Sequence, residues 1–326
     1  MRHWEGSVTL ALGAETGSMK SWTGSKVQFP RNLSLLWLAL GLLFVSLPGC
    51  AVRRREKLPP AILAPVLQKA TLEELLAKVL QQQKDIQTLN ATVGLQPSVT
   101  SMSKGEIVHY RDVRAFLLIR RSAFLRMIGQ SPVVRSTAFD MASDGETFRL
   151  YIPSRNRFIM GKSQGGERSE SALENMRPQH LLDALLWKPP EAGKEEAVLE
   201  AAQEGEKAYY VVHILRRSGE GNLALARKLW FERQGLTLER LQIFEDSGEA
   251  VTEVRYSNYA GFSGISYPQQ IVLDRPQDHY GMILTISKIE FNQPLGDEKF
   301  LLEQPPGTEL IDLEKTSLVE KAGDVG

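Results

Sequence analysis

Histidine and carboxylate side chains are the groups in this 326-residue chain that could carry acid–base or metal chemistry. None of the five histidines is spaced from another as a metal-binding pair, and the sequence lacks both a His-Glu-x-x-His and a Gly-x-Ser-x-Gly motif. Asp274, Asp278 and His279 lie close together in the sequence, but a polar loop explains this group more simply than an acid–base site. No active-site role is filled, so we expect no enzyme, no metal and no cofactor.

The charge composition argues against another class of function. Lysine plus arginine and aspartate plus glutamate both number 39, so the formal net charge is zero. A nucleic-acid-binding protein usually has a basic excess, and we therefore expect no nucleic-acid partner. The single cysteine, Cys50, rules out a disulfide within the chain and a cysteine-based metal cluster.

Cys50 stands at the end of a segment with the layout of a secretion signal. Basic residues precede an apolar run over residues 33–47, and Pro48 and Gly49 then lead into the cysteine. A basic region, an apolar region and a small residue before the cleavage point are typical of a signal peptide. The run of 15 residues is shorter than the roughly 20 that cross a bilayer. A short anchor kept in the mature protein is the alternative.

The four residues Leu47-Pro48-Gly49-Cys50 resemble the lipobox of bacterial lipoproteins. The resemblance implies that Cys50 is acylated, for example with palmitate, and becomes the first residue of the mature chain. Ala51 then favours the outer membrane over retention in the inner membrane. Two or more acyl chains anchor a protein stably, at about 0.8 kcal/mol per buried CH₂. We expect a lipid-anchored protein of the cell envelope, on the outer membrane and facing the periplasm; an incidental cysteine is the alternative.

Composition divides the chain into four segments. Residues 1–49 are the predicted signal peptide, within which residues 1–18 have the character of a mis-called start. Residues 50–70 carry the lipidated cysteine and a tether rich in proline and arginine. Residues 71–310 form the predicted folded domain, and residues 311–326 form a C-terminal tail.

Two helical segments are predicted in the folded domain. Thr71 and Glu74 have the spacing of a capping box, and apolar residues at helical spacing follow as far as Ile86. A second helix is predicted at about 171–187, with Pro178 suited to a first helical turn.

Most of the remaining domain has the period-two alternation of β-strands. The predicted strands are 88–96, 105–111, 112–120, 123–129, 134–143, 146–152, 157–161, 207–216, 224–233, 236–245, 249–260, 268–274 and 281–291. Asp144-Gly145 predicts a hairpin turn, and a change of phase predicts a β-bulge near Glu239-Arg240. We expect residues 191–206 to be an exposed acidic segment and the chain from Pro294 onwards to be mostly irregular.

A sheet of about eleven antiparallel strands usually curls. The sequence therefore predicts a mainly β (α+β) fold. In it, a curled sheet forms an incomplete barrel, and helices plug its concave face.

Several stretches resemble the LolA/LolB lipoprotein-carrier and receptor superfamily. Arg120 to Arg126 resemble the basic pair before a short hairpin in the carrier, Ser143 to Pro153 match its Asp-Gly hairpin, and Phe300 with Pro305-Pro306-Gly307 resembles the close of its fold. The carrier has proline where Ser122 stands.

Three further stretches resemble the membrane-anchored receptor of that superfamily. They are Phe124 to Val134, Leu182 to Pro189 and Tyr267 to Leu273. The chain departs from the family at Val133-Val134, where the receptor carries Leu-Gly. The resemblance implies an incomplete barrel whose cavity takes acyl chains.

The candidate binding residues combine apolar strand and helix positions with one arginine. They are Phe116, Leu118, Arg121, Phe124, Phe148, Leu182, Leu186 and Trp230. The resemblance also implies a membrane-contacting loop at Pro132, Val133 and Val134. Each apolar candidate could instead be ordinary core, and a one-residue change of register would exchange the two faces of a strand.

Three functions remain open at this stage. The protein could bind lipoproteins at the outer membrane, it could bind lipids without lipoprotein specificity, or it could be a structural lipoprotein whose barrel is filled by its own side chains. The expected partners are membrane lipids or lipoprotein acyl chains, with a periplasmic lipoprotein carrier as a candidate protein partner. We expect a monomer.

Overall fold

The computed structural model describes residues 66–101, 106–109, 112–121, 123–131, 135–165, 175–217 and 221–314. All of them belong to one compact unit, Ala64–Gly326, which contains the complete sheet and core described below. The predicted signal peptide, Cys50, most of the tether and the loop Pro132–Val134 lie outside the described residues.

The described residues form a single 15-stranded sheet. Its strands follow the order β15-β7-β6-β5-β4-β3-β1-β14-β13-β12-β11-β10-β9-β8, with β2 paired to β1. Neighbouring strands are antiparallel except for β15, which runs parallel to β7. The strands are β1 (Thr88–Ser101), β2 (Glu106–His109), β3 (Val113–Arg120), β4 (Phe124–Gln130), β5 (Thr137–Ser143), β6 (Thr147–Ile152), β7 (Arg157–Lys162), β8 (Glu195–Glu204), β9 (Lys207–Arg217), β10 (Leu223–Glu232), β11 (Thr237–Phe244), β12 (Ala250–Phe262), β13 (Ile265–Arg275), β14 (Tyr280–Phe291) and β15 (Glu309–Asp312).

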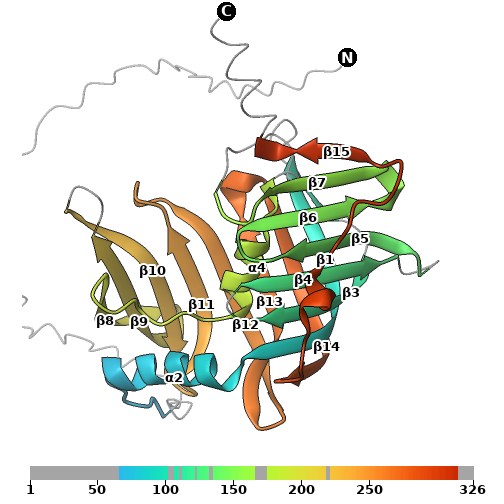
Figure 1. Ribbon diagram of the computed structural model, residues 1–326. Helices are drawn as coiled ribbons and strands as arrows, with labels where there is room; N and C mark the ends of the chain where they lie inside the picture. Colours follow the sequence, from blue (N-terminus) through green and yellow to red (C-terminus); the bar gives the residue numbers. More distant parts are fainter. Residues whose placement is uncertain are drawn as a thin grey trace, which may run out of the picture. The chain divides into compact units, whose positions relative to one another are not determined.

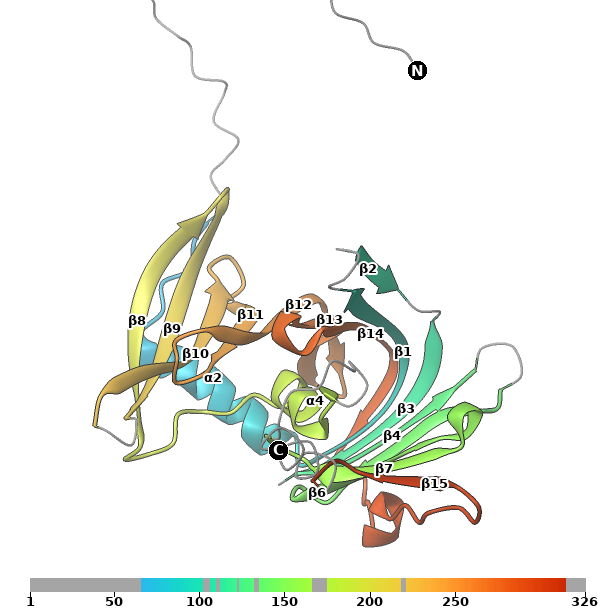
Figure 2. The same ribbon diagram turned by 90° about the horizontal axis from the view of Figure 1, so that it is seen from above.

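The sheet is curled but not closed, because its two ends, β15 and β8, do not pair with each other. Figure 2 shows the sheet curving around helix α4 (Pro178–Leu185). Helix α2 (Leu72–Asp85) runs across the ends of the strands that include β10 and β11 (Figure 1). The predicted incomplete barrel with helices on its concave face is therefore confirmed.

Helix α2 begins at the capping box predicted from the sequence. The backbone N–H of Glu74 donates to Thr71 Oγ1 over 3.3 Å, and the backbone N–H of Thr71 donates to Glu74 Oε2 over 2.8 Å. These bonds satisfy two N–H groups that a helix start leaves without partners. Leu75 and Val79 on one face of the helix are buried in the core, which fixes the helix against the sheet.

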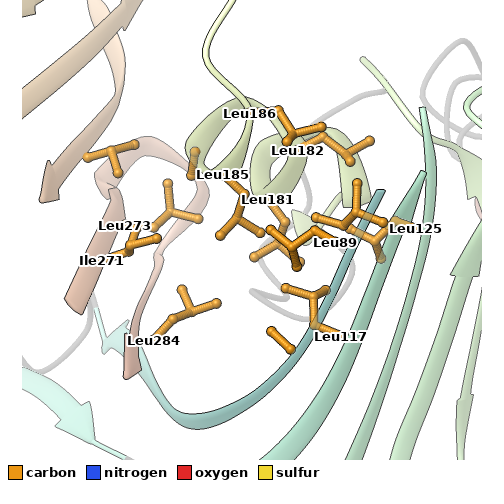
Figure 3. Close-up of a cluster of buried hydrophobic side chains, with 14 of the residues drawn as sticks. Leu89, Leu117, Leu125, Leu181, Leu182, Leu185, Leu186, Ile271, Leu273 and Leu284 are labelled. Carbon is orange, nitrogen blue, oxygen red and sulfur yellow. The ribbon is translucent and has the colours of Figure 1, made fainter. Parts of the chain in front are cut away.

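The core lies on the concave side of the sheet and is centred on α4. Figure 3 shows the leucines of α4 packed against side chains from a run of neighbouring strands at the middle of the sheet. Leu89, Leu117 and Leu125 come from β1, β3 and β4, whereas Ile271, Leu273 and Leu284 come from β13 and β14. Burying one such side chain fully contributes about 1.5–3 kcal/mol, so these contacts hold α4 firmly against the concave face.

Two local predictions about the strands are confirmed. Asp144-Gly145 connects β5 to β6, with Gly145 at a φ of +100°. Asp144 Oδ1 accepts the backbone N–H groups of Glu146 and Thr147 over 2.9 and 2.8 Å. In the β10–β11 pair, Trp230 is opposite Arg240 and Phe231 is opposite Leu238, so Glu239 is the extra residue of the predicted bulge.

Two strands are missing from the expected set. Residues 195–204 are largely exposed, as expected, but they form strand β8, because their backbone pairs along its length with β9. The chain after Pro294 is mostly irregular, as expected, but Glu309–Asp312 form β15 through parallel pairing with β7. Within the described residues, the second helix covers only Pro178–Leu185 of the predicted 171–187, and its proline stands at the helix start as expected.

Candidate functional site

A cavity of about 700 Å³ lies where the segment after α4 approaches β10 and β11; we call it the large cavity. Its volume is within the range of small-molecule binding sites. Its apolar wall consists of Leu186, Trp187, Pro189, Pro190, Ala226, Leu229, Leu238, Leu241 and Ile243. Its polar lining consists of Gln83, Arg121, Gln164, Asp183, Lys188, Glu191, Glu195, Arg216 and Arg227. A site of this composition suits an amphiphile.

An irregularity in β10 shapes the wall of the large cavity. The pairing of β10 with β9 shifts between Leu225 and Arg227, which leaves Ala226 as an extra residue. As a result, the consecutive residues Ala226 and Arg227 both line the cavity, although neighbours in a regular strand point to opposite faces.

Ion pairs hold most of the charged side chains of the large cavity. Arg227 pairs with Glu195, with the two side chains only 15% and 12% exposed, and Arg227 Nη1 also donates to the Lys188 carbonyl oxygen over 3.0 Å. Lys188 Nζ lies 2.6 Å from Asp183 Oδ1. These contacts fix the segment after α4 against β8 and β10.

Arg121 lines the large cavity at the end where α2 meets the sheet. Its Nε donates to the Ile86 carbonyl oxygen over 2.6 Å, and its Nη2 lies 3.5 Å from Gln82 Oε1. Burial lowers the pKa of the Arg121 guanidinium, but an arginine remains charged at neutral pH.

A second, smaller cavity of about 240 Å³ lies on β1, β4, β5, β6 and β14. Its walls are mostly apolar and include Leu95, Met127, Phe139, Leu150, Ile152, Met176 and Met282, with Arg155 and Tyr280 among the polar residues. Its volume is about a third of that of the large cavity.

Two buried tyrosines hold the end of α4. The hydroxyl of Tyr256 donates to the Ala184 carbonyl oxygen over 2.8 Å, and that of Tyr267 donates to the Leu185 carbonyl oxygen over 2.7 Å. Burial raises the pKa of both tyrosines, so both remain protonated donors. The carbonyl groups at a helix end lack partners inside the helix, and these bonds satisfy two of them.

A buried polar cluster holds the other end of α4. His180 Nδ1 is hydrogen-bonded to the hydroxyl of Tyr280. Burial, and then the charges of Arg275 and Arg177, hold the pKa of His180 well below its ordinary value. Since burial also raises the pKa of Tyr280, its hydroxyl stays protonated and donates the hydrogen bond to Nδ1 of a neutral imidazole. This arrangement is a structural contact between α4 and β14.

The structure brings two of the eight candidate binding residues, Arg121 and Leu186, to the large cavity. Leu182 and Phe148 lie on the concave side but are buried in the core, 3% and 1% exposed. The other four, Phe116, Leu118, Phe124 and Trp230, lie on the convex face of the sheet.

The expectation that these four residues line a cavity is corrected by the alternation of side chains along each strand. In β3 and β4 the concave-facing residues are Leu117 and Leu125, so Phe116, Leu118 and Phe124 point the opposite way. By the same alternation, Trp230 points to the opposite face of the sheet from its cavity-lining neighbour Leu229. Each of the four residues is next in sequence to a residue on the concave face, so a shift of one residue separates the expected from the observed orientation.

The convex face has its own aromatic contacts. The rings of Phe124 and Phe300 lie 5.5 Å apart, and the guanidinium of Arg120 lies 4.2 Å above the ring of Phe124. Trp230 contacts Tyr209 edge-on, with ring centroids 5.6 Å apart. Phe300 belongs to the short helix η3 (Asp297–Phe300), so the C-terminal segment covers the apolar convex positions of β4.

Sequence reasoning did not single out Trp187, Leu229, Leu238 and Leu241 as candidate binding residues. The predicted bulge at Glu239 could have indicated two of them. An extra residue at that point lets Leu238 and Leu241, which are out of phase in a regular strand, face the same side.

The described helices include none that is long and apolar enough to cross a membrane. The described residues also contain no group of three or more histidine, cysteine, aspartate or glutamate side chains placed to hold a metal ion.

Neither protein-family models nor curated proteins give a match to this sequence. Solved structures do. The LolA superfamily protein NE2245 from Nitrosomonas europaea is similar at 13% identity and a TM-score of 0.45, over 69% of this chain and 97% of that one. A DUF1329 family protein from Desulfovibrio piger is similar at 12% identity and a TM-score of 0.48, over 70% of this chain and 94% of that one.

A putative outer membrane lipoprotein-sorting protein domain from Vibrio parahaemolyticus is similar at 13% identity and a TM-score of 0.44, over 70% of this chain and 94% of that one. At these identities the likeness concerns the fold alone.

Proposed function

We propose that this chain is a lipid-anchored protein of the bacterial cell envelope that binds acyl chains in the large cavity. The chains would belong to membrane lipids or to lipoproteins, and the protein would act in their localisation at the outer membrane. The observation that carries the proposal is the large cavity itself. Its apolar wall includes Leu229, Leu238 and Leu241, and charged side chains also line it. Acyl-chain binding needs a concave apolar surface with a few polar groups, and no catalytic group.

The anchor follows from the sequence around Cys50. Acylation of this cysteine would hold the protein at the membrane on the periplasmic side, with residues 51–65 between the anchor and the described residues. The loop Pro132–Val134, between β4 and β5, would contact the membrane, and a periplasmic lipoprotein carrier would deliver the cargo. The protein would act as a monomer.

The second candidate function is that of a structural lipoprotein without a ligand. It is favoured by the position of α4, whose leucines already fill the centre of the concave face (Figure 3). In that case the apolar surface beside α4 would serve only to bury the protein's own side chains.

Native mass spectrometry separates these two functions. The chain from residue 58 to 326 contains the whole compact unit and would be purified from a bacterial host without denaturant. We expect an adduct with the mass of a fatty acid or a phospholipid, and uptake of a fluorescent acyl probe. A mass without adduct together with no probe uptake would rule out acyl-chain binding and leave the structural function.

Cell fractionation tests the role in localisation. Loss of the gene should move other lipoproteins away from the outer membrane if the cargo is a lipoprotein. Bound lipid with normal lipoprotein sorting would restrict the function to lipid binding.

A further inference from the structure

Every charged side chain that lines the large cavity, except one, forms an ion pair with a side chain of opposite charge. The compensated pairs are Asp183 with Lys188, Glu195 with Arg227, Glu191 with Lys194 and Arg216 with Asp246. In each of these pairs at least one member lines the cavity. A ligand would gain little from pairing with any of these groups, because each already has an opposite charge.

Arg121 is the exception. Its two hydrogen-bond acceptors, the Ile86 carbonyl oxygen and Gln82 Oε1, are neutral. No carboxylate in the described ranges of the chain forms an ion pair with it. Its side chain is half-buried, and burial opposes its charged form strongly enough to lower its pKa. A half-buried charge without a counter-ion is unfavourable, and an incoming anion would relieve it.

The topology puts Arg121 at one end of an elongated apolar wall. Arg121 directly follows the last residue of β3. The antiparallel pairing places this last residue at the same end of the strands as the first residue of β11. Along β11 the cavity-lining residues run from Leu238 to Ile243. Because Glu239 is the extra residue of the bulge, this stretch lies opposite four residue steps of β10, from Phe231 to Arg227, which is about 13 Å at the usual rise of a strand. Arg216, at the opposite end, is paired with Asp246.

We propose that the large cavity selects amphiphiles with a negatively charged head group. The carboxylate or phosphate of the ligand would pair with Arg121, and its apolar chain would lie along β11 toward Ile243. This inference rests on the proposed function, since it adds a charge preference to the same cavity. Arginine suits the task because its guanidinium can donate two parallel hydrogen bonds to either oxyanion.

The test compares three ligands that share a twelve-carbon chain: dodecanoate, dodecanol and dodecylammonium. Each would displace a fluorescent acyl probe from residues 58–326 at low salt and below its micelle concentration. We expect dodecanoate to bind about tenfold or more tightly than dodecanol, because a charge-assisted hydrogen bond contributes more than a neutral one. Dodecylammonium should bind most weakly, and the preference for dodecanoate should shrink in high salt.

Two variants assign the preference to Arg121. Arg121→Gln should bring the dodecanoate and dodecanol affinities within about threefold of each other, whereas Arg121→Lys should keep part of the difference. Arg114→Gln makes the same change of charge on an exposed residue of β3 and should leave the ratio as in the unmodified protein. The readout is the ratio of the affinities for dodecanoate and dodecanol. A general loss of affinity from altered packing affects both ligands and therefore cancels.

Lysophosphatidylglycerol and lysophosphatidylcholine with equal chains extend the test to phosphate head groups. Both carry a phosphate, but only the first has a net negative charge, because choline neutralises the second. The preference could appear with dodecanoate, with lysophosphatidylglycerol or with both, and each result supports the inference. Equal affinity for charged and neutral ligands, or a preference that survives Arg121→Gln, would overturn it while acyl-chain binding stands. Failure of all the ligands and of the probe to bind would overturn the proposed function instead.

Discussion

The hydroxyl of Tyr267 on β13 reaches the backbone carbonyl oxygen of Leu185 at the end of α4, 2.7 Å away in the interior of the protein. Tyr256 on β12 makes the corresponding bond to the carbonyl of Ala184. The helix that fills the concave face is thus held by side chains from the sheet that it covers. The segment that follows the helix, from Leu186 to Glu191, lines the large cavity, so these bonds also position part of the candidate site.

Replacing Tyr267 by phenylalanine should destabilise the fold. The change Tyr267→Phe leaves the ring in place but leaves the Leu185 carbonyl oxygen buried without a donor, which costs about 1–3 kcal/mol. Urea denaturation would measure the free energy of unfolding. The control is Tyr210→Phe, since the described residues provide no hydrogen-bond partner for the Tyr210 hydroxyl, and it should change stability by less than about 0.5 kcal/mol. Equal effects of the two changes would contradict the importance of the bond.

Acidification should destabilise the protein through His180. The folded protein holds the pKa of His180 well below its ordinary value, by burial and by the nearby charges of Arg275 and Arg177. Below about pH 6.5 the unfolded chain therefore takes up a proton that the folded protein does not. The stabilising contribution is fully present above pH 6.5 and is lost as the pH falls, by about 1.4 kcal/mol per pH unit.

The variant His180→Gln isolates this contribution. Its free energy of unfolding, measured by urea denaturation at several values between pH 5 and 7, should fall less steeply with acidification than that of the unmodified protein. Carboxylates that respond to pH are common to both proteins and cancel in the comparison. Identical pH profiles would show that His180 takes up its proton equally in the folded and unfolded states.

Much of the fold could be predicted from the sequence because local interactions determine it. The capping box at Thr71, the turn at Asp144-Gly145 and the bulge at Glu239 each depend on neighbouring residues, and each is confirmed. Strand β8 could not be found in this way. Its sequence alternates little, and most of its side chains are exposed, so backbone pairing with β9 rather than burial of apolar residues determines it.

The candidate site was harder to predict than the fold. Strand β3 is apolar on both faces, because the core covers one face and the convex face is also partly covered. Alternation then gives no information on which residues face inward, and Phe116 and Leu118, two of the expected binding residues, lie on the convex face. Arg121 was identified through a resemblance, and its position at the large cavity depends on the contact of α2 with the sheet.

Shortening Leu182 should test whether α4 is part of the core. Leu182 is 3% exposed, and Leu182→Ala should cost about 2–5 kcal/mol through lost contacts and the space left behind. Leu301, which is 60% exposed, provides the control, because Leu301→Ala should change the free energy of unfolding by less than about 0.5 kcal/mol. A melting temperature unaffected by Leu182→Ala would mean that α4 is not packed as described.

A charge in the predicted membrane-contacting loop should impair function without unfolding the protein. In the sequence Val134 stands between β4 and β5, and a surface loop of the kind proposed here generally tolerates a charge. Val134→Glu should therefore keep the melting temperature of the unmodified protein but reduce binding to vesicles of bacterial phospholipids. Unchanged vesicle binding would remove the loop from the proposed function.

Filling the large cavity should abolish acyl-chain binding while the fold is kept. Leu229 on β10 lines the cavity, and the next strand position, Trp230, points to the convex face. A cavity of about 700 Å³ has room for an indole ring, so Leu229→Trp should cost less than the roughly 1–3 kcal/mol of overpacking in a filled core. The affinity for a fluorescent acyl probe should fall at least about tenfold, as the ring occupies the path of the chain along the wall.

Lys228→Trp is the matched control for this change. Lys228 is the preceding residue of the same strand and points to the convex face, where its ammonium group lies 5.5 Å from the centre of the Phe244 ring. Its replacement adds the same indole ring outside the cavity. If binding depends on the space inside the cavity, the affinity for the probe should remain within about twofold of that of the unmodified protein. Equal losses in both variants would indicate a general disturbance of β10. Unchanged binding in Leu229→Trp would place the acyl chain elsewhere, and the smaller cavity at Met127 and Phe139 would then be tested in the same way.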